Sequence, residues 1–250
     1  MNSKHHFGRI VLAIFLLTTL IGCEDDTSPN NSDSSIEYLV VGSVVLWPTI
    51  SVFGTITSIY GRVNDIDSVI FGDSACVIEQ APSSVEGNQY SYTFSYFKLA
   101  DSLRFQSGDT ALVRIVRDDE VVVIPIKLLQ VPQDTIAVIS PPNMSTVSPN
   151  QNINIVWHKI PNADWYGIYI IHDTSQFSAP TRQAYRYSLD TTYTIPGSEH
   201  PMESNYHIYI SATTGPVPNA QGNINSETMT GAMYSTAFPN VRYGLEISVE

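Results

Sequence analysis

Short runs rich in Val, Ile, Thr and Tyr recur from about residue 38 to residue 249, and clusters of Gly, Asn, Asp and Pro separate them. The last run is the clearest, because every second residue between Val241 and Val249 is apolar and the residues between are Arg, Gly, Glu and Ser. Strict alternation predicts a strand with one buried face and one solvated face. Sustained helical periodicity is nearly absent, whereas a parallel sheet would need crossover helices. The pattern therefore predicts an all-β chain of antiparallel β-sandwiches.

Breaks in this pattern divide the chain into two tandem domains, expected at residues 36–131 and 134–250. The stretch Val131-Pro-Gln-Asp-Thr interrupts the alternation and marks the boundary. The expected strands are 38–46, 49–60, 68–71, 75–79, 90–97, 111–116 and 121–129 in the first domain, and 136–139, 152–158, 165–172, 185–188, 193–195, 206–212 and 241–249 in the second. Residues 215–238 are expected to form a decorated loop or an extra hairpin of the second domain.

The second domain carries the motifs Ile153-x-Ile155-x-Trp157, Tyr166-x-Ile168-x-Ile170, Thr192-Tyr-Thr-Ile195 and Tyr206-x-Ile208-x-Ile210-x-Ala212. Over residues 134–214 these motifs resemble strands B, C, E and F of a fibronectin type III domain. The resemblance implies that Trp157 is the core tryptophan and that Tyr206 is a corner tyrosine whose hydroxyl bonds to the backbone. The first domain resembles no family, and an Ig-like sandwich is expected there from strand number and patterning alone.

The N-terminus has the features of an export signal. Lys4 and Arg9 precede the apolar run 10–21, which ends at Gly22 and Cys23. The run is shorter than the roughly 20 apolar residues of a membrane-spanning helix. Leu-Ile-Gly-Cys23 also resembles the bacterial lipobox, which implies cleavage after Gly22 and acylation of the Cys23 thiol. Residues 1–22 are therefore expected to be a signal peptide and Cys23 a membrane anchor.

Residues 23–35 are expected to form a flexible acidic tether, because they lack apolar side chains to bury. The cluster Glu24-Asp-Asp26 resembles the surface-export signal of Bacteroidota lipoproteins, and the alternative is a merely solvated linker. The expected location is the outer membrane, with display at the cell surface.

Charge and cysteine content narrow the classes of partner. The formal charge is 12 − 24 = −12, and loss of Lys4 and Arg9 makes it 10 − 24 = −14. Such a balance argues against nucleic acid, which requires a basic surface. With Cys23 acylated, Cys76 is alone and no intrachain disulfide can form, so stability must come from apolar cores. Cys76 itself is expected to be a buried small hydrophobic residue.

No catalytic residue, metal site or cofactor site is predicted. Gly72-Asp-Ser74 resembles the nucleophile block of GDSL-type esterases, but no Asp-x-x-His follows to supply a base, so we expect a turn between strands. The oxygen-rich loops 64–67 and 118–120 are explained by turn formation. His200 and His207 show no zinc spacing and are expected on a solvated face.

The function expected is that of a non-enzymatic binding or spacer module with a protein partner outside the cell. Trp165, Tyr185 and Tyr187 are the candidate contact residues, because they lie near loop ends. The aromatic row in 90–97 is expected to face the core, with a sugar-stacking platform as the alternative. A glycan-binding lipoprotein would show an exposed aromatic row. A structural subunit of an envelope assembly would show an exposed apolar patch or an unpaired edge strand, expected in 215–238.

Overall fold

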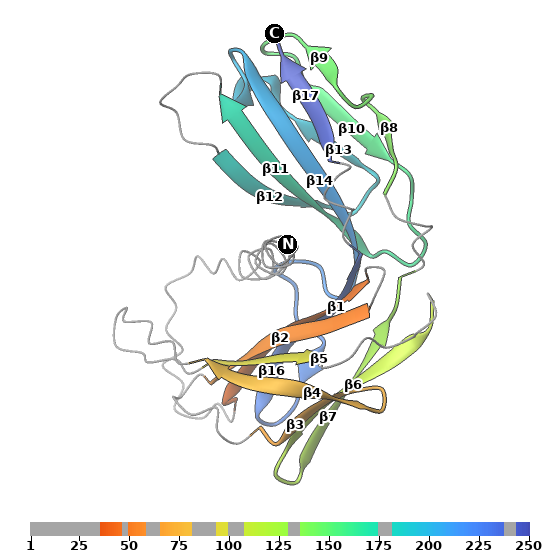
Figure 1. The fold of residues 1–250 in the computed structure, drawn as a ribbon, viewed down its shortest axis with the longest axis vertical. Helices are drawn as coiled ribbons and strands as arrows, with labels where there is room; N and C mark the ends of the chain where they lie inside the picture. The colour runs from red at the N-terminus through yellow and green to blue at the C-terminus, as the bar shows by residue number, and fades with distance from the viewer. Residues whose placement is uncertain are drawn as a thin grey trace, which may run out of the picture. The chain divides into compact units, whose positions relative to one another are not determined.

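The structure is a computed structural model of the chain, and it describes residues 36–46, 50–58, 66–81, 94–99, 108–129, 136–174, 182–237 and 244–250. The chain forms two compact units (Figure 1). Unit 1 comprises residues 1–128 and 215–235, and unit 2 comprises residues 129–214 and 236–250. Each unit is therefore built from two separate stretches of sequence.

Unit 1 is an antiparallel β structure. Its strand order is β16-β1-β2-β5-β4-β3-β6-β7. The strands are β1 (Tyr38–Leu46), β2 (Ile50–Ser58), β3 (Ser68–Phe71), β4 (Ser74–Ala81), β5 (Phe94–Leu99), β6 (Thr110–Arg117), β7 (Glu120–Lys127) and β16 (Met229–Ala237), with the short β15 (Ile224–Asn225) paired to β16.

Strand β4 joins the two halves of unit 1. Its first residues, Ser74 and Ala75, pair with β3, and from Cys76 onward it pairs with β5. Buried side chains of β1 and β2 share one apolar cluster with those of β3, β6 and β7. The two halves therefore enclose a single core. Alternation along β6 directs every second side chain into this core, namely Ala111, Val113 and Ile115.

The late hairpin β15–β16 completes this core. Ile224, Met229 and Met233 are buried in the cluster formed by the first stretch of unit 1. The Asn223 side chain fixes the hairpin, because it donates to the Met233 carbonyl at 2.9 Å and accepts from the Met233 N–H at 2.8 Å. A Cβ on Gly231, whose φ is +138°, would lie 1.9 Å from the Val40 carbonyl oxygen, so this backbone approach requires glycine.

Unit 2 is a two-sheet sandwich. The larger sheet has the order β12-β11-β14-β17-β9, and the smaller has the order β13-β10-β8. The strands are β8 (Val138–Ser140), β9 (Ser145–Val147), β10 (Ile153–Trp157), β11 (Trp165–Thr174), β12 (Arg182–Ser188), β13 (Thr192–Ile195), β14 (Ser204–Thr214) and β17 (Leu245–Val249). All pairings in unit 2 are antiparallel except β9 with β17. The expected B and E strands, β10 and β13, pair in one sheet, and the expected C and F strands, β11 and β14, pair in the other.

The core of unit 2 contains both residues that the family resemblance singled out. Trp157 is buried, and its ring meets the edge of the Tyr166 ring at 5.3 Å. Tyr206 is also buried, and its ring stacks on His172 at 4.3 Å. The Tyr206 hydroxyl contacts Nδ1 of His200 at 3.2 Å, and Nε2 of His200 contacts the Gln151 carbonyl at 2.6 Å. The hydroxyl thus reaches the backbone through a histidine, where the resemblance implied a direct bond.

The all-β antiparallel fold is confirmed, and most strands lie within two residues of their predicted ends. The placement of 215–238 differs from the prediction, because residues 215–235 belong to unit 1 and form the hairpin β15–β16. The solvated position predicted for His200 is wrong, because the two polar contacts of its ring let it lie buried. Within the described residues, no helix is long and apolar enough to cross a membrane. Cys23, residues 1–35 and the aromatic row before Phe94 lie outside the described residues.

Candidate functional site

The outer face of the larger sheet in unit 2 gathers aromatic side chains. The inner face of β11 and β14 is apolar and packs in the core. The outer face would ordinarily be polar. Instead, five aromatic residues share it, and we call this surface the tyrosine face: Trp165, Tyr169, Tyr185, Tyr187 and Tyr209.

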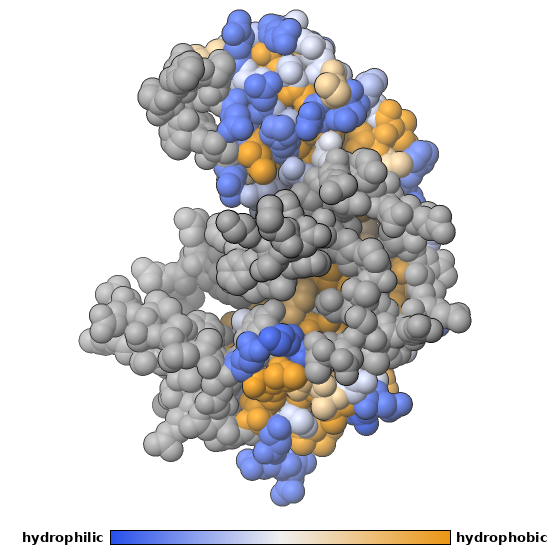
Figure 2. All heavy atoms as spheres, in the orientation of Figure 1, coloured by the Kyte–Doolittle hydropathy of each residue, from blue (hydrophilic) through white to orange (hydrophobic). Residues whose placement is uncertain are grey.

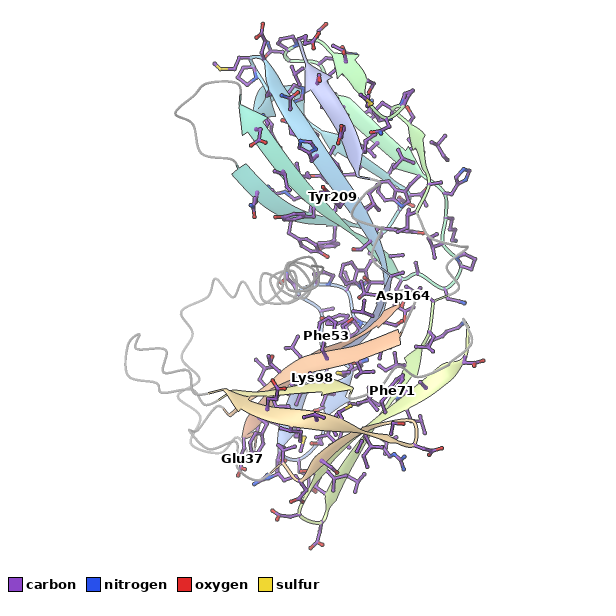
Figure 3. The ribbon with its side chains drawn as sticks, in the orientation of Figure 1. Glu37, Phe53, Phe71, Lys98, Asp164 and Tyr209 are labelled. Carbon is purple, nitrogen blue, oxygen red and sulfur yellow. The ribbon has the colours of Figure 1, made fainter. Side chains whose placement is uncertain are left out.

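Strand register brings these five residues together. In the pairing of β11 with β12, Tyr169 lies opposite Tyr185 and Gly167 lies opposite Tyr187. On the other side of β11, Tyr169 lies opposite Tyr209 of β14, which is labelled in Figure 3. Directly opposed residues in a sheet point to the same face. The aromatic residues therefore form a band across three adjacent strands.

Ring contacts hold the band together. The Tyr169 and Tyr209 rings lie 6.3 Å apart and tilted by 31°, and the Trp165 and Tyr187 rings meet edge to face at 6.5 Å. Both distances fall in the range where aromatic pairs attract. The Tyr169 hydroxyl donates to Oε1 of Gln183 at 2.6 Å, which fixes the ring at the edge of the band.

Gly167 makes room for the tyrosines. A Cβ on Gly167 would lie 2.2 Å from the Tyr185 hydroxyl oxygen and 2.6 Å from Oγ of Ser211. Any larger residue would push the Tyr185 side chain away from the sheet. The absence of a side chain here lets Tyr185 lie close over the backbone of β11.

Polar side chains border the band toward β17. Nδ1 of His207 lies 3.6 Å from a carboxylate oxygen of Glu246, and the Ser248 hydroxyl donates to Oδ1 of Asn205 at 3.1 Å. The aromatic band thus adjoins hydrogen-bonding groups on the same sheet face. Flat apolar rings beside a few polar groups are a usual composition of binding surfaces.

Burial raises the pKa of two phenols on this face. The pKa of Tyr169 is raised, first by burial and then by the neighbouring Tyr209. The pKa of Tyr209 is raised by burial and then by the Glu246 carboxylate. Both hydroxyls, like ordinary tyrosines, are protonated at neutral pH, and the shift extends their uncharged hydrogen-bonding form further into the alkaline range.

The three predicted contact residues differ in how far their side chains are exposed. Tyr187 is 42% exposed and Tyr185 is half-buried. The expectation that Trp165 is an exposed contact is wrong, because its indole is 1% exposed. The indole packs edge to face against the Tyr187 ring. Tyr169 and Tyr209 were missed, although both side chains lie on the outer face of the sheet, where Tyr169 is buried and Tyr209 is half-buried. Alternation could have assigned both residues to the outer face, but their positions opposite each other and opposite Tyr185 depend on strand register.

The other motifs have structural roles. Gly72 and Asp73 form the turn between β3 and β4, as predicted, and Ser74 begins the second strand. Asp118 and Asp119 form the turn between β6 and β7. Among the residues that the structure describes, no three His, Cys, Asp or Glu side chains are grouped to hold a metal ion.

Comparison with known proteins adds little to this description. No protein-family model and no curated protein matches the chain. Among solved structures, the chain is similar to the crystal structure of domains A168–A170 from titin, with 9% sequence identity and a TM-score of 0.25. The match covers 71% of this chain and 60% of that chain, so this chain spans less than two thirds of that structure's length.

Proposed function

We propose that the chain is a non-enzymatic lipoprotein of the cell envelope, anchored through Cys23, and that its tyrosine face binds a protein partner outside the cell. One observation carries the binding surface: five aromatic residues occupy a sheet face that would ordinarily be polar, and three of them, Tyr185, Tyr187 and Tyr209, are not buried. Tyrosine and tryptophan are enriched at protein interfaces, because one side chain supplies both apolar area and a hydrogen-bonding group.

Site-specific photo-crosslinking tests the protein partner. A photoreactive phenylalanine analogue at position 187 of the full chain, expressed in its native cells, is expected to give one discrete protein adduct. The same analogue at Met202, which is 47% exposed and lies outside the tyrosine face, serves as the matched control. An adduct from position 202 and none from position 187 would contradict the proposal.

A second candidate is glycan binding, favoured by the polar side chains beside the aromatic band. Pyranose rings stack on flat aromatic side chains while neighbouring polar groups bind the hydroxyls. In this case a saccharide panel gives binding that Tyr187→Ala abolishes and Met202→Ala preserves. Saccharide binding without a protein adduct at position 187 would favour this candidate over the first.

The anchor has a separate test. Radiolabelled palmitate is expected to enter the wild-type protein and to be absent from Cys23→Ser. Label that persists in the variant, or fails to enter the wild type, would contradict the lipoprotein proposal. Neither result would bear on the proposal that the tyrosine face binds a partner.

A further inference from the structure

Strand β7 is an unusual edge. It ends the strand order of unit 1, and among the described residues it pairs with β6 alone. Among the described strands, the others that end a sheet have two to four residues (β8, β9, β13 and β15) or carry arginine, as β12 does at positions 182 and 186. Strand β16, at the other end of unit 1, pairs with both β1 and β15. Short length, charged side chains and proline are the usual protections of an edge, and of these the interior of β7 carries one proline, Pro125. Strand β7 has eight residues and no charged side chain between Glu120 and Lys127.

The hairpin turn determines which backbone groups of β7 point outward. The two-residue turn Asp118–Asp119 makes Arg117 and Glu120 a hydrogen-bonded pair. The bond from the Leu128 N–H to the Asp109 carbonyl, at 2.8 Å, follows the same alternation. Even-numbered residues of β7 therefore bond to β6, and odd-numbered residues direct their backbone groups away from it. Val121 and Val123 thus offer a donor and an acceptor each, and Pro125 offers an acceptor only.

The side chains beside this edge are apolar and exposed. Val121 is 53% exposed and Val123 is 50% exposed, and Leu112 on the adjacent β6 is 44% exposed. Figure 2 shows a hydrophobic area on unit 1, with hydrophilic side chains at the end where the β6–β7 turn lies. The six charges of residues 110–127 cancel, being those of Arg114, Arg117, Asp118, Asp119, Glu120 and Lys127. This hairpin is therefore neutral in a chain of net charge −12.

The hairpin is held rigidly at its turn. Arg117 pairs with the Glu37 carboxylate at 2.7 Å (Glu37 is labelled in Figure 3), and the Asp118 N–H donates to the Asp67 carboxylate at 2.8 Å. The Thr228 hydroxyl donates to Glu120. An edge fixed in this way loses little conformational freedom when a second strand joins it.

We propose that β7 pairs antiparallel with β7 of a second copy of this chain, about a two-fold axis at Val123. Val123 then lies opposite Val123 of the second copy, and Val121 lies opposite Pro125. Each copy donates two backbone hydrogen bonds, from Val123 N–H to the Val123 carbonyl and from Val121 N–H to the Pro125 carbonyl. An isologous contact of this kind closes as a dimer and does not propagate into a filament.

Charge selects this register. With the axis at Val123, Lys127 lies opposite Asp119 of the second copy, at both ends of the pairing. An axis at Val122 would place Lys127 opposite Arg117, which is repulsive. An axis at Ile124 would place Lys127 opposite Val121 and leave Asp119 opposite Leu129. The two-fold pairing at Val123 is therefore the one that joins opposite charges.

Cysteine crosslinking of the full chain in detergent micelles tests the proposal. Val123→Cys places two thiols in one hydrogen-bonded pair, with Cα atoms about 5.5 Å apart, within disulfide range. Leu112→Cys is the matched control, because its two thiols would lie about 19 Å apart, across three strand spacings and four residues along the strand. The native Cys76 is buried, so it does not compete. We expect a disulfide-linked dimer from Val123→Cys at least tenfold faster than from Leu112→Cys, and equal rates would overturn the proposal.

Sedimentation of the uncrosslinked protein supplies the second readout. Val123→Lys, on an exposed position, puts like charges face to face at the axis and is expected to weaken the dimer at least tenfold. Asp119→Lys and Lys127→Asp are each expected to weaken it, and the double variant to restore it. A wild-type chain that is monomeric at every concentration, or a dimer that Val123→Lys leaves intact, would refute the pairing.

Discussion

At the scale of single residues, the buried group His172–Tyr206–His200 is the most constrained polar cluster of unit 2. The Gln151 carbonyl can only accept, so Nε2 of His200 carries the proton and Nδ1 of the neutral ring accepts from the Tyr206 hydroxyl. Each polar atom of this chain of contacts is satisfied only while Tyr206 keeps its proton. Alkaline pH should therefore act on unit 2 through this residue.

We predict that unit 2 loses stability between pH 10 and pH 12. The pKa of Tyr206 is raised to about 12 by burial and by the Glu199 carboxylate. Below pH 10 both states hold the proton, whereas above it the unfolded state loses the proton first, so unfolding is favoured as pH rises. Two units of pKa correspond to about 2–3 kcal/mol. Urea unfolding at a series of pH values measures the loss.

Tyr206→Phe is the control for this effect. The variant lacks the ionisable group, so its stability should fall less steeply above pH 10. The decrease should not vanish, because burial also raises the pKa of Tyr166 and Tyr169 in the same unit. A variant with the wild-type slope would show that Tyr206 is not the group responsible.

At the scale of elements, alternation of apolar and polar residues predicts strands well where one face is solvated, and it fails where both faces are buried. Strand β6 alternates between buried and exposed residues and was predicted within one residue at each end. Strand β16 was missed, because Met229-Thr-Gly-Ala-Met-Tyr-Ser-Thr-Ala237 buries small polar residues as well as apolar ones. The tyrosine face was found only in part for a related reason, since its assembly depends on register between strands, which a single sequence does not specify.

We predict that Met233→Ala destabilises unit 1 by about 2–5 kcal/mol, the usual loss for a buried methionine. Met233 is fully buried in the core that also contains Cys76. Burial raises the pKa of the Cys76 thiol to about 11, so alkylation of Cys76 reports opening of that core. The alkylation rate should rise roughly 30-fold or more, since each 1.4 kcal/mol corresponds to a factor of ten.

Thr230→Ala is the matched control, because Thr230 lies in the same strand and is half-buried. Its effect on Cys76 alkylation should be several-fold at most. If Met233→Ala and Thr230→Ala change the rate equally, β16 does not contribute to the core of unit 1 as described.

At the scale of the whole molecule, the chain enters unit 1 twice and unit 2 twice. The expected cut near residue 131 is close to the first crossing, at Leu128–Leu129. The later crossings, near residues 214 and 235, nearly coincide with the ends of the segment 215–238 expected as a loop or extra hairpin. Which unit this segment joins could not be predicted, because that depends on which apolar face covers which core. Sequence patterning thus yields the class of fold but not the exchange of a hairpin between the two units.

We predict that residues 36–128 alone do not fold cooperatively, because the cluster would lack Ile224, Met229 and Met233. Joining residues 215–235 to this fragment through a flexible linker should restore a cooperative thermal transition. Circular dichroism and amide hydrogen exchange measure both fragments. A cooperative transition in 36–128 by itself would contradict the prediction.

The late hairpin also bears on how the protein is made. A chain emerging from the ribosome or an export channel has delivered residues 36–214 before residues 215–235 become available. Until then the core of unit 1 lacks Ile224, Met229 and Met233, and unit 2 still lacks β17. A prematurely terminated product would therefore leave both units open to proteases. Native structure in unit 1 consequently requires that synthesis has passed residue 235, and native structure in unit 2 requires that it has passed residue 249.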